Sequence, residues 1–340
     1  MIFPLPRGFN PAFLMPAKIL LIGAGRWGAN HLRTWLALGV DLWVVDANGK
    51  TLEKCAEAGV PCDRLGSSVR DFLVRVDAVD VVTPAETHPS LCSEAIAAGK
   101  DVFVEKPIAL TAAEGEDLVR RAAAAGRILQ VGHIFRYEPA TVALRNVISS
   151  GRLGEIRWLK GNFSGFKRPR MDSGVMMADG IHFVDLFNHL LGRSPVAARA
   201  RLLDLLDRGM DDNAWAWLDY EGAFAEIECG YFAPLKAREA LVVGTKGSAL
   251  LDYGAKQEKL KVFANRHVRE GGAWVAVEEG AEAVPVAAAE PLKIELQAFL
   301  DSLVSRIPPL ADGAAGVEAV RVTEALLRAA RENTTLSLCR

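Results

Sequence analysis

The sequence lacks any apolar stretch that approaches the ~20 residues of a membrane-spanning helix. Prolines interrupt the N-terminal segment where a signal peptide would need a continuous apolar region. An excess of charge is also missing: 40 basic and 42 acidic residues leave a formal net charge of −2, and the two signs are interspersed. These absences argue against a membrane protein or a nucleic-acid-binding surface and predict a soluble, cytoplasmic protein.

Cysteine is scarce as well. The five cysteines form no C-x-x-C pair and do not cluster with histidines at the spacing of metal ligands. We therefore expect reduced thiols and no metal site. Half of the 340 residues are apolar, which is enough to form substantial cores and predicts two domains.

Residues 17–28 organise the first half of the chain. The apolar run from Ile19 to Ile22 is typical of a buried parallel strand, and it leads directly into Gly23-x-Gly25-x-x-Gly28, where a helical pattern begins. In a dinucleotide site the first glycine makes the tight turn, the second lets the diphosphate approach the backbone, and the third packs the helix on the strand. The helix N-terminus would hold the diphosphate. This layout predicts a dinucleotide site; the alternatives are a flavin site and a purely structural turn.

A second apolar run ends at Asp46, 18 residues beyond Gly28. A carboxylate at this position binds both ribose hydroxyls and repels a 2′-phosphate, so it favours NAD over NADP. The nearby Lys50 keeps NADP open as an alternative.

Strands and helices alternate from the glycine-rich stretch to about residue 140, which predicts a doubly wound parallel sheet. Beyond it, short segments rich in β-forming residues predict a largely antiparallel sheet, and helices are expected over 291–305 and 313–332. The Ala/Glu/Val stretch near 275–290 is expected to be a long exposed loop. The predicted strands of the second half are 155–164, 196–203, 213–219, 223–231, 239–243, 248–252 and 259–263.

One stretch of the second half combines a histidine with two carboxylates. Asp179, His182 and Asp185 are three residues apart, so they lie along one side of a helix that Asp179 could cap. Carboxylates one turn away on either side can fix the tautomer of the imidazole and raise its basicity, which suits a general base. The alternative is a histidine that only satisfies a helix end.

Five motifs follow one another along the chain. They are Gly23-x-Gly25-x-x-Gly28, Thr83-Pro84-x-x-x-His88, Glu105-Lys106-Pro107, Gly132-x-x-x-Arg136-x-x-Pro139 and Gly180-x-His182-x-x-Asp185-Leu186. In this order they resemble the glucose-fructose oxidoreductase and inositol dehydrogenase (Gfo/Idh/MocA) family, and the resemblance spans nearly the whole chain.

The resemblance implies an α/β protein in which an NAD-binding Rossmann domain (17–138) follows a loose extension (1–16). A second α/β domain (139–340) would carry substrate and oligomer contacts on an open, mostly antiparallel sheet, and its C-terminal helix could pack back on the first domain.

The same resemblance implies that Lys106 is the catalytic lysine, that His182 is the acid/base histidine, and that Lys106-Pro107 is a cis bond. The family places an aspartate four residues before the histidine, where this chain has Ala178; Asp179 either replaces it as a third catalytic residue or only caps the helix. The expected cofactor-binding residues are Gly23, Gly25, Arg26, Trp27, Gly28, Asp46, Thr83, Pro84, His88, Glu105 and Lys106. The expected substrate-binding residues are Arg136, Lys167, Arg168 and His182.

The segment between the 155–164 strand and His182 carries three cations in four residues, among them Lys167 and Arg168. Guanidinium groups bind phosphate and carboxylate oxygens, so with the resemblance this loop favours a nucleotide-sugar dehydrogenase, acting for instance on a UDP-N-acetylhexosamine or a uronate. A solvated loop is the alternative. A free sugar or polyol substrate, an NAD-dependent glycosidase and an NAD-binding regulator remain open, and we expect a homodimer or homotetramer.

Overall fold

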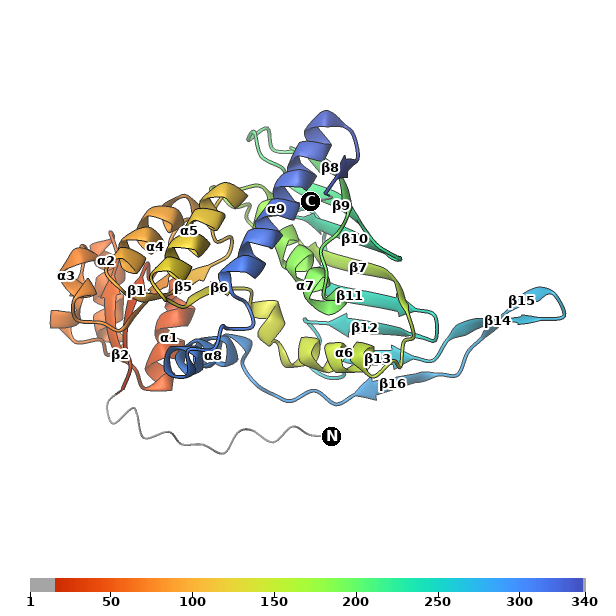
Figure 1. Cartoon of the computed structure of the whole chain (residues 1–340), viewed down its shortest axis with the longest axis horizontal. Coiled ribbons are helices and arrows are strands. Elements are labelled where there is room, and N and C mark those ends of the chain that lie inside the picture. Colours follow the sequence, from red (N-terminus) through yellow and green to blue (C-terminus); the bar gives the residue numbers. More distant parts are fainter. Residues whose placement is uncertain (1–15, 339–340) are drawn as a thin grey trace.

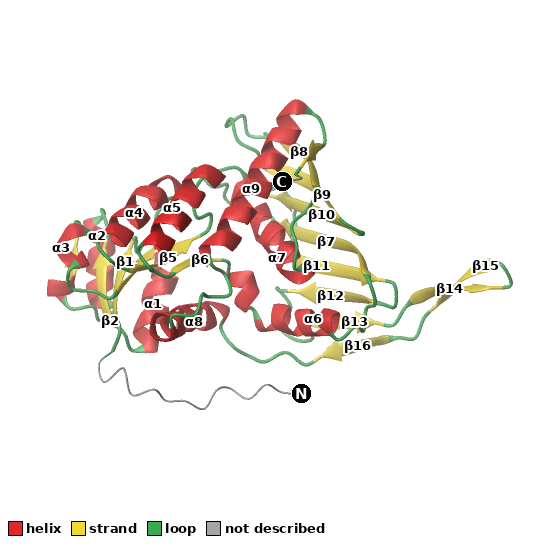
Figure 2. Ribbon diagram, in the orientation of Figure 1, coloured by secondary structure: helices red, strands yellow, loops and turns green. Residues whose placement is uncertain are grey.

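The computed structural model describes residues 16–338, so the predicted extension over residues 1–16 lies almost entirely outside the described residues. Two sheets form the two halves of the molecule, and helices lie against both (Figure 1; Figure 2). Within the described residues, no helix is both long and apolar enough to cross a membrane.

The first half is a six-stranded parallel sheet. Its strand order is β3-β2-β1-β4-β5-β6, the doubly wound order of a dinucleotide-binding domain, as predicted. The strands are almost continuous apolar runs because helices cover both faces. The strands are β1 (Lys18–Ile22), β2 (Asp41–Val45), β3 (Leu65–Gly66), β4 (Ala78–Val81), β5 (Asp101–Glu105) and β6 (Leu129–Gly132). The helices are α1 (Gly28–Leu38), α2 (Gly49–Glu57), α3 (Arg70–Leu73), α4 (His88–Ala97) and α5 (Ala112–Ala124).

The second half is a nine-stranded sheet of order β16-β13-β12-β11-β7-β10-β9-β8-β17. It is antiparallel except for the pair β7 and β10, which confirms the predicted fold class. The strands are β7 (Ile156–Ser164), β8 (Ala197–Leu203), β9 (Asn213–Tyr220), β10 (Ala223–Gly230), β11 (Ala237–Gly244), β12 (Ser248–Asp252), β13 (Leu260–Phe263), β16 (Ala281–Val284) and β17 (Leu336–Ser337). A separate hairpin consists of β14 (Arg266–Glu270) and β15 (Ala273–Val277).

The strands after β13 differ from the prediction. The segment near 275–290, expected to be a loop, contains part of β15 and all of β16, which pairs with β13. Alanine and glutamate have a low propensity for strands, and the pairing with β13 outweighs that local propensity.

The remaining helices are α6 (Pro139–Ser149), α7 (Ile181–Leu191), α8 (Pro291–Ser305) and α9 (Gly313–Glu332). The helices α6, α7 and α9 pack on the nine-stranded sheet, whereas the buried side chains of α8 belong to a core of the first half. The C-terminal helix α9 packs on α5 of the first half as well as on α7 and β8, and α8 packs on α1. Val317 and Val320 belong to the core of the first half, whereas Val322 and Leu326 belong to the core of the second.

Candidate active site

The glycine-rich loop between β1 and α1 has the geometry that a dinucleotide requires. Gly23 has a φ of +87°, and a Cβ there would lie 2.6 Å from the Val82 carbonyl oxygen. A Cβ on Gly28 would lie 2.1 Å from the Gly23 carbonyl oxygen, so close packing of α1 on the loop needs both glycines. A Cβ on Gly25 would meet nothing within 4 Å, which leaves open space where a diphosphate would approach.

Asp46 follows β2 and is fixed beside this loop. One carboxylate oxygen accepts a hydrogen bond from the Ala24 backbone N–H at 2.8 Å, and the other accepts from the Asn48 backbone N–H at 2.8 Å. The first turn of α1 contains no acidic side chain, so no carboxylate of α1 competes with an anion at its N-terminus. These residues fit NAD, which would supply the hydride acceptor at its nicotinamide ring.

We expect Asp46→Ala to relax the preference for NAD over NADP, because the variant removes the carboxylate that repels a 2′-phosphate. The ratio of kcat/KM with NAD to kcat/KM with NADP should fall about tenfold, which corresponds to roughly 1.4 kcal/mol. Steady-state kinetics with both coenzymes measures this ratio. An unaltered ratio would contradict the assignment of Asp46 to the ribose.

Lys106 follows β5 at the junction of the two halves. The Lys106-Pro107 peptide bond is cis, which confirms the expectation from the family resemblance. The Lys106 ammonium donates to the Ala178 carbonyl oxygen at 2.5 Å, so residues 72 positions apart meet here. Burial lowers the pKa of Lys106, Asp179 opposes this shift, and Arg170 adds to it. A lysine whose pKa is lowered transfers a proton more readily at neutral pH.

His182 lies in the first turn of α7 and is 9% exposed. Its imidazole stacks on Phe135, at a centroid distance of 4.9 Å, and on Phe163, at 5.5 Å, and these two rings are 6.2 Å from each other. Its Nδ1 atom is buried and has no hydrogen-bond partner among the described residues. Burial, and then the Lys106 charge, lower the pKa of His182 well below its usual value. The imidazole is therefore neutral at neutral pH and can accept a proton.

The structure corrects the predicted role of Asp179 and Asp185, the two carboxylates that flank His182. The two aspartates were expected to hold the imidazole, but Phe135 and Phe163 fix its plane. Asp185 instead turns toward Arg136, and its Oδ2 atom lies 3.6 Å from Nδ1 of His133.

Asp179 does not cap the helix, contrary to one of the two predictions. It lies within a π-helical turn, Met176–Gly180, that continues directly into α7. Its Oδ2 atom accepts from the Lys167 ammonium at 2.6 Å, and its charge raises the pKa of Lys106. π-Helical turns are frequent at functional sites. The turn brings Asp179 into electrostatic range of the site lysine.

The basic loop contributes Lys167 to this site. Its ammonium lies 4.7 Å from the centroid of Phe163 and 5.2 Å from that of Tyr231. Arg168 is exposed and makes no hydrogen bond or ion pair within the described part of the chain. The third cation of the loop, Arg170, pairs with Asp172 at 2.7 Å.

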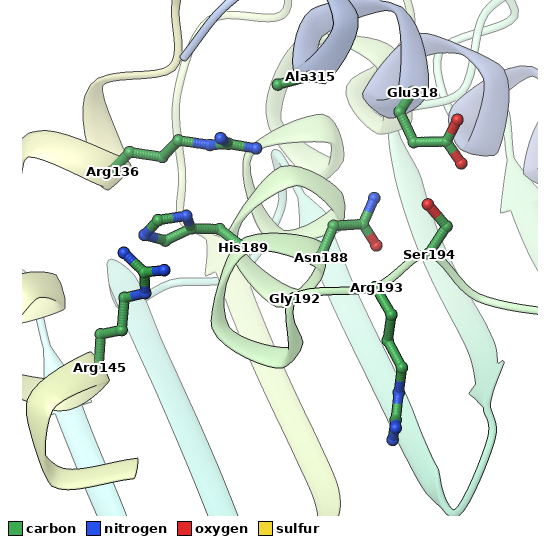
Figure 3. Close-up of a pocket in the computed structure, with 9 residues that line it drawn as sticks. All are labelled: Arg136, Arg145, Asn188, His189, Gly192, Arg193, Ser194, Ala315 and Glu318. Atoms are coloured by element: carbon green, nitrogen blue, oxygen red, sulfur yellow. The ribbon is translucent and has the colours of Figure 1, made fainter. Parts of the chain in front are cut away.

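The Arg136 side chain forms hydrogen bonds with other residues of the protein. Its guanidinium makes a forked ion pair with Asp185 and donates to the Leu310 carbonyl oxygen at 2.7 Å. It also lines a cavity of about 300 Å³ near the C-terminal end of α7, where His189 and Arg145 lie beside each other (Figure 3). Arg136 therefore orients Asp185, and its geometry does not support the predicted substrate contact.

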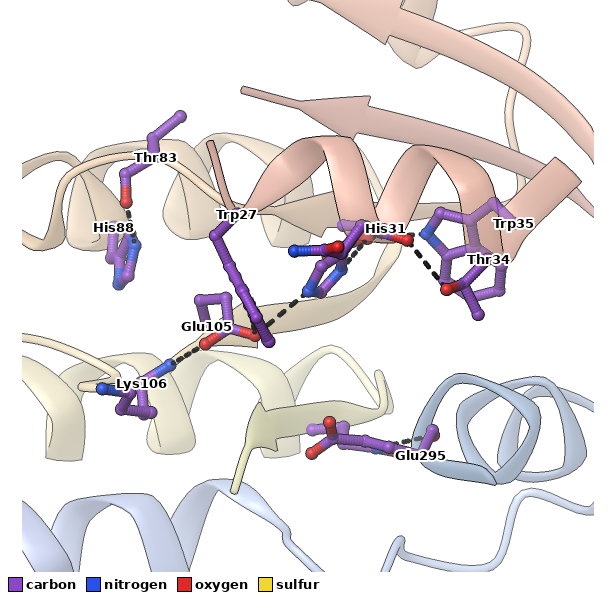
Figure 4. A network of polar contacts seen from close by, with 12 residues as sticks. Trp27, His31, Thr34, Trp35, Thr83, His88, Glu105, Lys106 and Glu295 are labelled. Carbon is purple, nitrogen blue, oxygen red and sulfur yellow. Dashed lines mark hydrogen bonds and ion pairs between the residues drawn. The ribbon is translucent and has the colours of Figure 1, made fainter. Parts of the chain in front are cut away.

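A buried polar network connects α1 to the strand that ends before Lys106 (Figure 4). His31 faces Asp80 at 2.8 Å through Nδ1 and Glu105 at 3.1 Å through Nε2, and the Trp27 indole donates to Glu105 at 2.8 Å. Burial alone would lower the pKa of His31, but Asp80 and then Glu105 outweigh it and raise the pKa to about 10. Glu105 and Trp27, predicted to bind cofactor, thus bind each other.

The raised pKa of His31 predicts how the unfolding free energy of the protein depends on pH. Because its pKa is about 10 in the folded state and about 6.5 when unfolded, its contribution is complete below pH 6.5 and is lost as pH rises to 10. The difference in unfolding free energy between the natural protein and His31→Gln should shrink by about 1.4 kcal/mol per pH unit in this range. Urea melts at several pH values measure it; a control, His267→Gln on the exposed surface, should show no such trend.

The remaining predicted cofactor-binding residues lie between β1 and α1 and between β4 and the start of α4. His88 bridges two loops, with Nδ1 at 2.8 Å from the Pro107 carbonyl oxygen and Nε2 at 2.9 Å from that of Thr83. Pro84 is exposed beside Thr83, and Arg26 is exposed at the start of α1. His88 thus connects the cis-proline loop to the loop after β4.

Sequence reasoning missed several residues of the site. Arg238 of β11 lies 3.5 Å from the Phe163 centroid, and buried His133 lies 3.6 Å from Asp185. Arg238 stands in no motif, and His133 is a variable position of the motif Gly132-x-x-x-Arg136-x-x-Pro139. Only the pairing of β11 with β7 brings Arg238 to the site.

A dinucleotide loop facing a lysine and a histidine from two separate halves is the arrangement of a nicotinamide-dependent oxidoreductase. Residues 17–133 match the oxidoreductase family with an NAD-binding Rossmann fold, and residues 141–250 match the GFO/IDH/MocA C-terminal domain. The chain belongs to the Gfo/Idh/MocA family of NAD-dependent oxidoreductases.

Individual relatives support this assignment. The UDP-N-acetylglucosamine 3-dehydrogenase of Acidithiobacillus ferrooxidans is 30% identical over 300 residues, covering 87% of this chain and 91% of that protein. Inositol 2-dehydrogenase 1 of Saccharopolyspora erythraea is 28% identical over 359 residues, covering 95% and 97%. The solved structure of the Acidithiobacillus ferrooxidans enzyme superposes with a TM-score of 0.80 at 28% identity, over 94% of this chain and 99% of that one.

Proposed function

We propose that this protein transfers hydride between a secondary alcohol of a nucleotide sugar, of the UDP-N-acetylhexosamine type, and NAD. The observation that supports this best is the charge around Lys106 and His182. Lys167 and Arg238 contact the rings beside His182, and Arg170 is close enough to influence Lys106. With Lys106 these are four cations, and the carboxylates among them are Asp179, Asp172 and Glu105. The surplus of positive charge suits a diphosphate or a carboxylate on the substrate.

In the proposed reaction, the neutral imidazole of His182 takes the proton of the substrate hydroxyl. The Lys106 ammonium donates to the same oxygen and stabilises its developing negative charge. Bound NAD accepts the hydride from the sugar carbon. The aromatic rings of Phe135 and Phe163 keep the imidazole in one plane and exclude water from it.

A substrate panel tests this proposal. Reduction of NAD is followed at 340 nm with UDP-N-acetylglucosamine, the corresponding uronate, free N-acetylglucosamine and myo-inositol. We expect the highest kcat/KM with a UDP-sugar. The highest value with inositol would support the second candidate, a polyol dehydrogenase, which the inositol dehydrogenases among the relatives favour. Release of an aglycone without net NADH would indicate a glycosidase, and no turnover would indicate a regulator.

The basic loop gives a second test of the substrate class. The double variant Lys167→Ala/Arg168→Ala should raise KM for a UDP-sugar about tenfold or more, because charge-assisted hydrogen bonds contribute roughly 1.5–3 kcal/mol each. KM for a neutral polyol should change much less. Equal changes for both substrates would mean that the loop is merely solvated.

We also propose a cytoplasmic homo-oligomer, either a dimer or a tetramer. The face of the nine-stranded sheet opposite α7 supports it. This face exposes or half-exposes large apolar side chains on neighbouring strands, more than an uncovered monomer surface normally carries. They are Trp158, Trp215, Trp217, Phe224, Leu241 and Leu250.

A further inference from the structure

The hairpin of β14 and β15, here called the arm (residues 266–277), projects past the ends of β13 and β16 in the nine-stranded sheet (Figure 1; Figure 2). It forms a two-stranded sheet separate from the other strands. A two-stranded hairpin by itself is at best marginally stable in water. A stable position for the arm therefore requires another surface against which it packs.

The sequence of the arm nevertheless specifies a β-hairpin. Gly271 and Gly272 occupy the two central positions of its turn with φ values of +55° and +89°, the pattern of the two-residue turn that best fits the twist of a hairpin. Arg266 and Glu279 form an ion pair at its base. The arm is therefore a defined element with its own turn chemistry and not a loose connection.

Apolar side chains lie on both faces of the arm. Trp274 is opposite Arg269 in the register and is 71% exposed. On the other face, Val268 is opposite Val275, which is 37% exposed. Uncovered apolar groups that flank a charge are typical of an interaction surface.

The open face of the nine-stranded sheet has the complementary features. In one row across the strands, Trp215 is opposite Glu228, and Glu228 is opposite Asn162, which is followed by Glu239. Neither glutamate pairs with a cation among the described residues, and Arg269 of the arm pairs with no carboxylate there. The face thus offers an aromatic ring and two free carboxylates to a tryptophan and an arginine.

The arm cannot reach this row in its own subunit. Trp215 lies on β9, five strands from β13, which at about 4.8 Å per strand is roughly 24 Å across the sheet. The arm also extends past the ends of β13 and β16, away from the rest of the sheet (Figure 1). In a two-fold pair of subunits, an arm that contacts the open face of the other copy is matched by the same contact in return.

We propose that the arm docks on the open sheet face of a second copy of this chain, with Trp274 against Trp215 and Arg269 near Glu228 and Glu239, reciprocally in both subunits. This inference rests on the homo-oligomer of the proposed function. It adds the element that holds the copies together and the residues that specify the pairing.

Sedimentation velocity over a wide dilution series tests the proposal on the full-length protein. Trp274→Ser and Arg269→Glu should each raise the dissociation constant of the oligomer about tenfold or more, because aromatic and arginine residues dominate interface energetics. Adding Glu228→Arg to Arg269→Glu should restore part of the affinity. The control Val74→Ser, at a residue of the first half that is 85% exposed, should leave it unchanged.

The outcomes separate the two proposals. If the natural protein is an oligomer whose dissociation constant neither arm variant changes, the arm is not an interface and the homo-oligomer stands. If the natural protein is a monomer at every concentration, both are overturned. Neither result depends on hydride transfer, so the catalytic proposal is tested independently by the substrate panel.

Discussion

Lys106→Met is expected to lower kcat about 10³-fold while the dissociation constant for NAD changes by less than about twofold. Methionine has a similar length but cannot donate a proton or a hydrogen bond to the substrate oxygen. The lysine also contacts the Ala178 carbonyl oxygen, so the variant loses one hydrogen bond between the two halves. Single-turnover kinetics and coenzyme titration by fluorescence measure the two quantities.

Two controls make this result specific. The thermal unfolding midpoint of Lys106→Met should stay close to that of the natural protein, which would exclude a collapsed fold. Lys100→Met, near the start of the same strand, should keep full turnover, since its ammonium only donates to the Val76 carbonyl oxygen. Turnover by Lys106→Met within tenfold of the natural value would reject the assignment of Lys106.

His182→Gln should lower kcat by about 10²- to 10⁴-fold, the usual contribution of a positioned general base. Glutamine keeps polar atoms near the site but cannot accept a proton at neutral pH. KM should change little, because the proposed role is in the transition state. Steady-state kinetics on the preferred substrate separates the two parameters, and a change confined to KM would contradict a proton-transfer role.

The pH profile of the natural enzyme gives a further check on His182. The base must be neutral to act, and burial and the Lys106 charge lower its pKa. The acid limb of kcat/KM should therefore lie below pH 6.5, the usual histidine pKa. An acid limb above that value would mean that another group takes the proton.

The sequence predicted those parts of the site that depend on strand ends. Glycines at fixed offsets after an apolar run, and Lys106 after another, lie together because parallel strands end at one edge of a sheet. His182 lies in the other half, and only the ordered motifs of the family predicted that it lies near Lys106. In the structure the Lys106 ammonium donates to the carbonyl oxygen of Ala178, which precedes His182 by one helical turn.

What sequence reasoning missed depends on tertiary contacts. No spacing rule connects His31 of α1 with Asp80 of β4 and Glu105 of β5, because three separate elements bring them together. The helical pattern before His182 was right, but a period of 3.6 residues cannot reveal a π-helical turn. A helix cap was therefore one of the two predicted roles of Asp179, although the residue lies inside a longer helix.

The π-helical turn before α7 makes the spacing between residue 178 and His182 unusually sensitive to insertions and deletions. Each residue of an α-helix advances by about 100° around the axis, and a π-helical turn holds one additional residue. Loss of a single amino acid within Met176–Gly180 would rotate everything upstream by that angle relative to His182. A change of chain length in this turn would thus present a different side chain to Lys106 and His182, without any substitution in the site.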